Sequence, residues 1–236
     1  MSGDAARPKR FHKTVSVEQG EGGFTIILDG RPARTLTRRP LVAQTAALAR
    51  AIADEWEKQG DHIDRQTMPL TGLLSASIDG DETTVDDWLK EILSYLKSDL
   101  LCYRAEKPDA LVLEQQAIWG PYLEWFEAAF GAKLMTTSSV IAIAQSDAAI
   151  AAVEETLRDV SVPALFAIKT ATAITGSATL ALAIWKHAFS VEEVFEAMRL
   201  DERFQEKRWG VDAEAKAREK MIERELQSAA VFLGLL

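Results

Sequence analysis

The sequence has one cysteine and three histidines among its 236 residues, and this scarcity excludes several classes of function. A single cysteine, Cys102, cannot form a disulfide within the chain and is typical of a reducing compartment. His12, His62 and His187 are scattered, and neither HExxH nor CxxC occurs, so the sequence predicts no metal site. No glycine pattern matches a dinucleotide-binding or phosphate-binding loop, so no cofactor is expected.

A surplus of basic residues and a long apolar run are also absent. The net charge of −9 and the sequence pI of about 5.0 argue against nucleic-acid binding. The most apolar window, residues 164–184, is interrupted by Lys169 and Gly176, which favours a buried helix over a membrane span. Residues 1–13 are basic but lack an apolar core, so they predict no secretory signal. We expect a cytoplasmic monomer.

What is present in the first hundred residues begins with strand patterns. Residues 13–17 alternate between polar and apolar types, and residues 24–28 are rich in β-branched and aromatic types. Asp29 and Gly30 predict a hairpin turn before a further short run at 33–36.

Helical patterns follow in the same part of the chain. Pro40 predicts the start of a helix whose apolar face ends at Trp56, and a second helix is expected from Val85 to about Lys97. Between them, residues 68–74 are typical of a turn. We therefore predict an α+β domain over residues 8–100.

The second half of the chain is expected to be almost entirely helical, which predicts an all-helical domain over residues 101–236. Apolar residues recur at helical spacing between proline, serine and glycine residues that favour helix ends. The expected helices cover residues 108–130, 146–159, 163–187, 190–209 and 212–235.

One face of the expected helix 190–209 changes from apolar to polar along its length. Apolar side chains at its start give way, at the same spacing, to Glu202, Gln205 and Trp209. Because burying an unpaired carboxylate is costly, these groups either have partners inside the fold or belong to a binding surface. We predict a partner-binding surface made of Glu202, Gln205, Glu206 and Trp209. The alternative, that Glu202 pairs with a nearby basic residue (Arg203, Lys207 or Arg208), stays open.

Trp56 is a further candidate for partner binding. A buried tryptophan contributes strongly to local packing, so Trp56 could anchor the core between the two halves. Tryptophan is also enriched among the residues that dominate binding energy at protein interfaces, which is the functional alternative.

Two other classes of function remain to be considered. Ser94 and Lys97 match the SxxK pattern of serine–lysine hydrolases, although no companion SDN or KTG motif occurs. The last residues, 231–236, are apolar enough for a scaffold that docks on a protein or lipid surface.

Several segments together resemble the assembly chaperone family that acts on the α subunit of the F-type ATP synthase. They cover the chain from about residue 8 onward and occur in the family's order. The segments are Arg10-Phe11 with the following hairpin, residues 52–59 with Glu55-Trp56, Met68-Pro69-Leu70-Thr71, residues 177–183, and Phe204-Gln205 with Trp209-Gly210.

The resemblance implies a small α+β domain followed by an orthogonal helical bundle, and a role without catalysis or nucleotide. It also implies a partner: the unassembled α subunit, whose aggregation the chaperone prevents until the β subunit arrives. The sequence lacks the N-terminal extension of mitochondrial members and has a short charged tail, so a bacterial member is expected.

Overall fold

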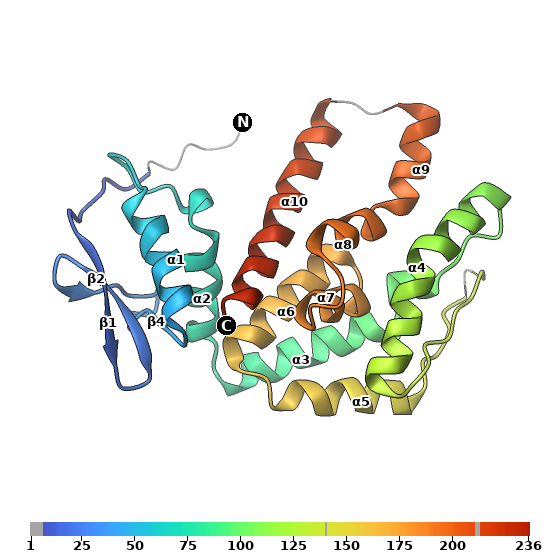
Figure 1. The fold of residues 1–236 in the computed structure, drawn as a ribbon, viewed down its shortest axis with the longest axis horizontal. Helices are drawn as coiled ribbons and strands as arrows, with labels where there is room; N and C mark the ends of the chain where they lie inside the picture. Colours follow the sequence, from blue (N-terminus) through green and yellow to red (C-terminus); the bar gives the residue numbers. More distant parts are fainter. Residues whose placement is uncertain (1–6, 140, 211–212) are drawn as a thin grey trace. The chain divides into compact units, whose positions relative to one another are not determined.

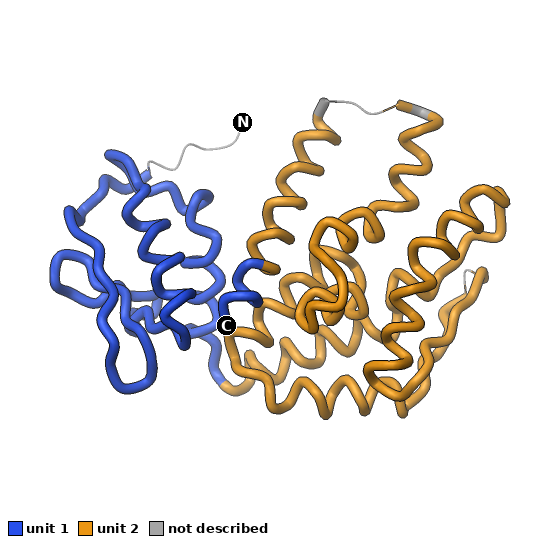
Figure 2. The backbone as a smooth tube through the Cα atoms, in the orientation of Figure 1, with its two compact units in different colours: residues 1–81, 231–236 blue, residues 82–230 orange. Residues whose placement is uncertain are grey.

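The computed structural model describes residues 7–139, 141–210 and 213–236, and its internal contacts define two compact units (Figure 2). Unit 1 contains the described residues up to 81 together with residues 231–236, and unit 2 contains residues 82–230. Helix α3, Glu82–Lys97, belongs to unit 2 because it packs on other helices of that unit. The predicted domains, residues 8–100 and 101–236, stay a prediction.

Unit 1 is built on a small antiparallel sheet with strand β2 at its centre. Strand β2 (Gly23–Leu28) pairs with β1 (Val15–Gly20) along its whole length, and with the short strands β3 (Arg31–Pro32) and β4 (Val42–Ala43). The predicted turn at Asp29 and Gly30 is confirmed, since both residues have positive φ angles (49° and 76°).

Two helices, α1 (Ala46–Glu57) and α2 (Pro69–Asp79), complete the main part of unit 1 (Figure 1). Helix α1 packs on β1, β2 and β4, and α2 packs on α1. The predicted helix start at Pro40 is wrong, because β4 intervenes and Thr45 caps α1 by accepting a hydrogen bond from the backbone of Leu48 (3.1 Å).

The turn predicted over residues 68–74 is also wrong, because α2 begins there. The N-cap residue Met68 offers no side-chain cap. Instead, the carboxylate of Glu55 on α1 accepts hydrogen bonds from the backbone nitrogens of Leu70 and Thr71, both at 2.8 Å. A cap supplied by another helix leaves no local signal in the sequence.

Unit 2 is helical, so the chain as a whole has the α+β fold that was predicted. Its helices after α3 are α4 (Asp109–Phe130), α5 (Asp147–Arg158), α6 (Val162–Thr175), α7 (Ala178–Trp185), α8 (Val191–Met198), α9 (Leu200–Trp209) and the larger part of α10 (Ala213–Gly234).

Helix α7 forms the centre of unit 2, since every residue from Ala178 to Ile184 is buried. The single helix expected over residues 163–187 is wrong, because Gly176 (φ 67°) ends α6 in the left-handed conformation. The buried carboxylate of Asp99 holds the start of α7 by accepting hydrogen bonds from the Ser177 hydroxyl (2.7 Å) and the Thr179 backbone (2.9 Å).

Candidate functional site

The helix expected over residues 190–209 is broken at Arg199, and this changes the surface on which the predicted site lies. Helix α8 begins with a capping box between Ser190 and Glu193 and ends at Met198. Arg199 (φ −99°, ψ 7°) separates it from α9. The expected continuous face, running from apolar to polar residues, is therefore wrong.

The polar groups of α9 meet a buried arginine. The side chain of Arg199 is only 10% exposed, and its Nη2 donates to Glu206 Oε1 at 2.6 Å. Its Nε lies 3.8 Å from Glu202 Oε2, and its Nη1 lies 3.9 Å from Glu219 Oε1 on α10. Three carboxylates from two helices thus surround one guanidinium, with Glu206 as the closest partner.

The predicted site residues differ in how exposed they are and in how closely they contact Arg199. The side chain of Glu206 is 25% exposed, whereas that of Glu202 is 64% exposed. Partial desolvation raises the pKa of Glu202, and Arg199 opposes the shift. Gln205 is exposed. Trp209 ends α9, but its side chain lies outside the described part of the structure.

The three basic residues proposed as partners of Glu202 have other neighbours, and the guanidinium of Arg208 lies 5.4 Å from the centroid of the Phe204 ring. Arg203 pairs with Glu196 of α8, and Lys207 Nζ lies 3.0 Å from Glu114 Oε1 of α4. Glu202 does pair with a basic residue, but that residue is Arg199 and not one of the three that the sequence suggested.

These ion pairs surround a groove of about 470 Å³ between α4, α8 and α9. Ile118, which is half-buried, supplies apolar surface, whereas Leu200 is buried beneath it (2% exposed). Glu206 is the one predicted site residue among those that line the groove. The remaining lining residues are Glu114, Glu196, Arg203 and Lys207. A hydrogen bond from Trp119 Nε1 on α4 to the carbonyl of Ala197 (2.8 Å) fixes the end of α8 beside the groove.

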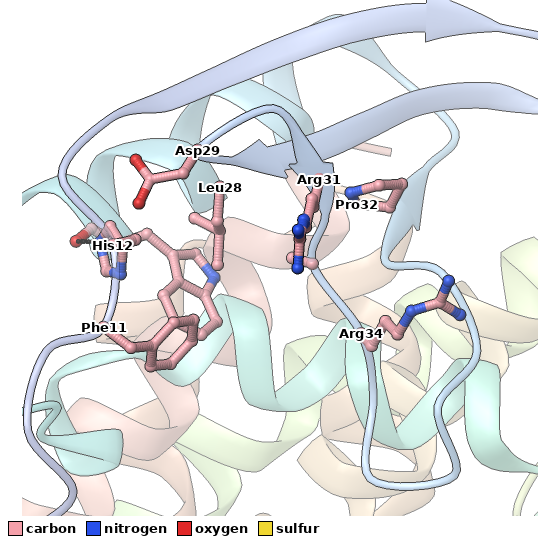
Figure 3. Close-up of a pocket in the computed structure, with 9 residues that line it drawn as sticks. Phe11, His12, Leu28, Asp29, Arg31, Pro32 and Arg34 are labelled. Carbon is pink, nitrogen blue, oxygen red and sulfur yellow. Dashed lines mark hydrogen bonds between the residues drawn. The ribbon is translucent and has the colours of Figure 1, made fainter.

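Trp56 belongs to a cluster of three rings in unit 1. Its ring centroid lies 6.1 Å from that of Phe11 and 5.5 Å from that of His12, both in edge-on geometry. Trp56 is half-buried and lines a pocket of about 850 Å³ with these two residues (Figure 3). Its role in partner binding stays a prediction.

The other side of this pocket was not found from the sequence. It includes Arg31 and Pro32 of β3 and Arg34 just beyond that strand. The two rings that precede β1 lie near these residues because β1 pairs with β2, which places Val15 opposite Leu28. A basic pair around Pro32 was the one local signal, and without the register of the strands it did not indicate a pocket.

The rival classes find little support in the geometry. Ser94 and Lys97 are exposed on α3, no hydrogen bond between their side chains occurs in the described residues, and neither lines the two pockets above. In the C-terminal segment, Phe232 and Leu233 are buried, and the carbonyl of Leu235 accepts a hydrogen bond from Thr45. These apolar residues therefore pack within the protein instead of forming a docking surface.

Among residues 7–139, 141–210 and 213–236, none of the helices combines the length and the apolar character that crossing a membrane requires. No group of three or more acidic, histidine or cysteine side chains is arranged to hold a metal ion in the same residues. Burial raises the pKa of the Cys102 thiol to about 12, consistent with an inert core residue.

The two pockets are lined by ion pairs, exposed arginines and aromatic rings, which are typical of surfaces that bind other molecules. The sequence profile of the ATP12 chaperone protein family matches residues 9–127. The chain belongs to this family of ATP synthase assembly chaperones. The family and its solved members are chaperones and not enzymes, which confirms the prediction that the chain is not an enzyme.

Solved structures agree with this membership. The chain is similar to the Atu1473 protein of Agrobacterium tumefaciens, described as a candidate chaperone, with 39% identity, a TM-score of 0.92, and 97% and 86% of the two chains covered. It is similar to Atp12 of Paracoccus denitrificans with 32% identity, a TM-score of 0.91, and 97% and 98% covered. A point mutant of that Paracoccus protein matches equally well (TM-score 0.91, 32% identity, 97% and 97% covered).

Proposed function

We propose that this chain binds the unassembled α subunit of the ATP synthase catalytic head and prevents its aggregation until the β subunit arrives. A free subunit of a ring exposes apolar patches that self-associate. A chaperone has to cover such a patch reversibly and then yield to the correct partner. The observation that supports this is the groove beside α9, where the half-buried side chain of Ile118 is surrounded by ion-paired side chains.

We propose further that Glu202, Gln205, Glu206 and Trp209 contribute to the surface that contacts the client. The carboxylate of Glu202, which is 64% exposed and lies 3.8 Å from Arg199, and the exposed amide of Gln205 are accessible to a client, while Arg199 fixes Glu206 more closely. Charged groups at the rim of an interface mainly affect association rate and specificity. Trp56 is proposed as a contact in unit 1.

The first experiment is co-expression of the α subunit with and without this chain, followed by size-exclusion chromatography. We expect the α subunit to move from aggregate into a soluble complex with this chain, and added β subunit to release it. Aggregation of the α subunit regardless of this chain would contradict the proposal.

The site is tested by Glu202→Lys and Gln205→Ala, with Glu225→Lys as a matched control on the exposed side of α10. We expect Glu202→Lys to weaken α-subunit binding about tenfold, since charge reversal at an interface rim removes electrostatic complementarity. Equal binding by Glu202→Lys and the control would remove α9 from the client surface.

The remaining proposals concern the oligomeric state of the chain and its location in the cell. We propose that the chain acts as a monomer in the bacterial cytoplasm. Analytical ultracentrifugation and cell fractionation test these two statements, and a dimeric sedimentation coefficient or recovery outside the cytoplasm would contradict them.

A further inference from the structure

The pocket of unit 1 combines rings on one side with arginines on the other. Phe11 and His12 come from the segment before β1, and Arg31 and Arg34 lie in and after β3 (Figure 3). Phe11 is 68% exposed, which is unusual for a large aromatic side chain that is held by contacts with two other rings. An exposed ring beside a pocket of about 850 Å³ is typical of a binding site.

Two nitrogen atoms in the wall of this pocket are buried without a hydrogen-bond partner. They are Nδ1 of His12, a residue that is only 4% exposed, and Nε1 of Trp56. An unsatisfied buried polar atom typically costs about 1–3 kcal/mol, so each one calls for an explanation.

The two atoms have opposite requirements. His12 Nε2 lies 3.2 Å from the carbonyl oxygen of Trp56, and because a carbonyl oxygen can only accept, Nε2 carries the hydrogen. In the neutral ring Nδ1 is then an acceptor, whereas the indole nitrogen of Trp56 can only donate. A ligand that satisfies both atoms therefore has to offer one donor and one acceptor.

A peptide group has this combination, since its N–H donates and its C=O accepts. Inorganic phosphate at neutral pH also has a P–OH donor and acceptor oxygens, but it has no apolar group to contact the exposed ring of Phe11. The two nitrogens together with the ring therefore favour a stretch of polypeptide over a simple anion. Both nitrogen atoms are buried, so a ligand reaches them only if a covering side chain moves. The exposed ring of Phe11 contacts the rings of both His12 and Trp56, so it is the side chain that would have to move.

The basic residues around the pocket indicate which side chains a bound segment would carry. The whole chain carries −9, but residues 7–39 contain eight basic and three acidic residues, a net charge of +5. Arg31 is exposed, and its side chain has no ion pair or hydrogen bond among the residues that the structure describes.

Asp29, the acidic residue of the pocket, is held by the backbone and forms no ion pair with the arginines among the described residues. Its carboxylate accepts hydrogen bonds from the backbone nitrogens of Lys13 and Thr14 (3.0 and 2.8 Å), which lower its pKa and keep it ionised. It offsets one of the charges of Arg31 and Arg34, so the lining keeps a net positive charge, which favours a ligand with a carboxylate.

We propose that this pocket binds an extended segment of the client polypeptide in which an apolar side chain lies next to an acidic one. The apolar side chain packs against the rings, the peptide group pairs with His12 and Trp56, and the carboxylate pairs with Arg31. The inference rests on the proposed function in that the segment belongs to the unassembled α subunit. It adds a contact in unit 1, separate from the α9 groove of unit 2.

The test uses the full chain, the purified α subunit, and overlapping peptides that cover the α-subunit sequence. Binding is compared for the unmodified chain, Arg31→Glu, and Trp56→Phe, which keeps a ring but removes the indole N–H. Arg50→Glu on the exposed side of α1 makes the same charge change outside the pocket and is the matched control.

We expect a subset of peptides with adjacent apolar and acidic residues to bind. Arg31→Glu and Trp56→Phe should each weaken their binding about tenfold, and Arg50→Glu should not. Replacing the acidic residue of a bound peptide with its amide should remove the effect of Arg31→Glu, and inorganic phosphate should not displace the peptide.

The inference is overturned if no peptide binds, if phosphate displaces the peptide, or if both pocket variants bind like the control. If the pocket variants bind the whole α subunit normally while Glu202→Lys does not, the pocket inference fails and the proposed function stands. If the unmodified chain does not bind the α subunit at all, the proposed function itself fails.

Discussion

Replacing Arg199 with methionine should destabilise unit 2 by removing the charge on which three carboxylates converge. Methionine fills much of the same volume, so the loss is mainly electrostatic. Glu206, at 2.6 Å from the guanidinium, and Glu219, at 3.9 Å, would be left in a partly desolvated position without their cation.

The magnitude follows from how deeply the partners are buried. Removing one partner of a fully buried ion pair typically costs about 3–5 kcal/mol. The side chains of Glu206 and Glu219 are 25% and 23% exposed, so hydration of their carboxylates offsets part of this cost. We expect a loss of about 2–3 kcal/mol in the free energy of unfolding. For a chain of this size that corresponds to a fall in Tm of roughly 5–10 °C.

The assay is urea unfolding followed by circular dichroism, with Arg199→Met, Glu206→Gln and the double variant measured as a cycle. We expect a coupling energy of about 1–2 kcal/mol between the two positions. Arg203→Met is the control, because Arg203 (36% exposed) and Glu196 (52% exposed) form a surface pair, for which about 0–1 kcal/mol is typical. A loss for Arg199→Met no larger than that for the control would refute the reasoning.

Three further predictions concern the fold around the two pockets. Gly23→Ala should destabilise unit 1 by about 2–3 kcal/mol, because the added Cβ would lie 2.3 Å from the Ala43 carbonyl at a φ of 136°. Gly22→Ala, whose added Cβ would have no atom within 4 Å, should cost only about 1 kcal/mol. Thermal unfolding of the two variants measures the difference. Trp119→Phe should lower stability by about 2 kcal/mol in urea, since it removes the buried hydrogen bond to Ala197, and an unchanged midpoint would contradict this. Cys102, with a pKa of about 12, should resist a thiol reagent at pH 8 and react once the chain is unfolded, whereas rapid reaction of the folded chain would show that it is accessible.

The parts of the fold that the sequence predicted have local causes. Asp29-Gly30 favours a tight hairpin by its own backbone preferences, and Pro108 and Gly131 mark the ends of α4. The family resemblance rested on short segments in a fixed order, and membership is confirmed by the match over residues 9–127.

The parts that the sequence did not predict depend on residues far apart in the chain. Helix α2 begins where Glu55 of another helix supplies its cap. Arg199 was overlooked because its partners include Glu219, which is twenty positions away on α10. The pocket of unit 1 was missed for the same reason, since Phe11 and Arg31 are brought together by strand pairing.

The distribution of unit 1 along the chain has a consequence for biosynthesis. Its compact core includes residues 231–236, and Thr45, which caps α1, also donates a hydrogen bond to Leu235. A ribosome delivers the strands and α1 first, but residues 231–236, which belong to the same unit, follow the whole of unit 2 in the chain. The pocket-bearing unit therefore reaches its final form only after nearly all of unit 2 has been translated. A chaperone organised in this way would acquire its complete client-binding surface only late in its own synthesis.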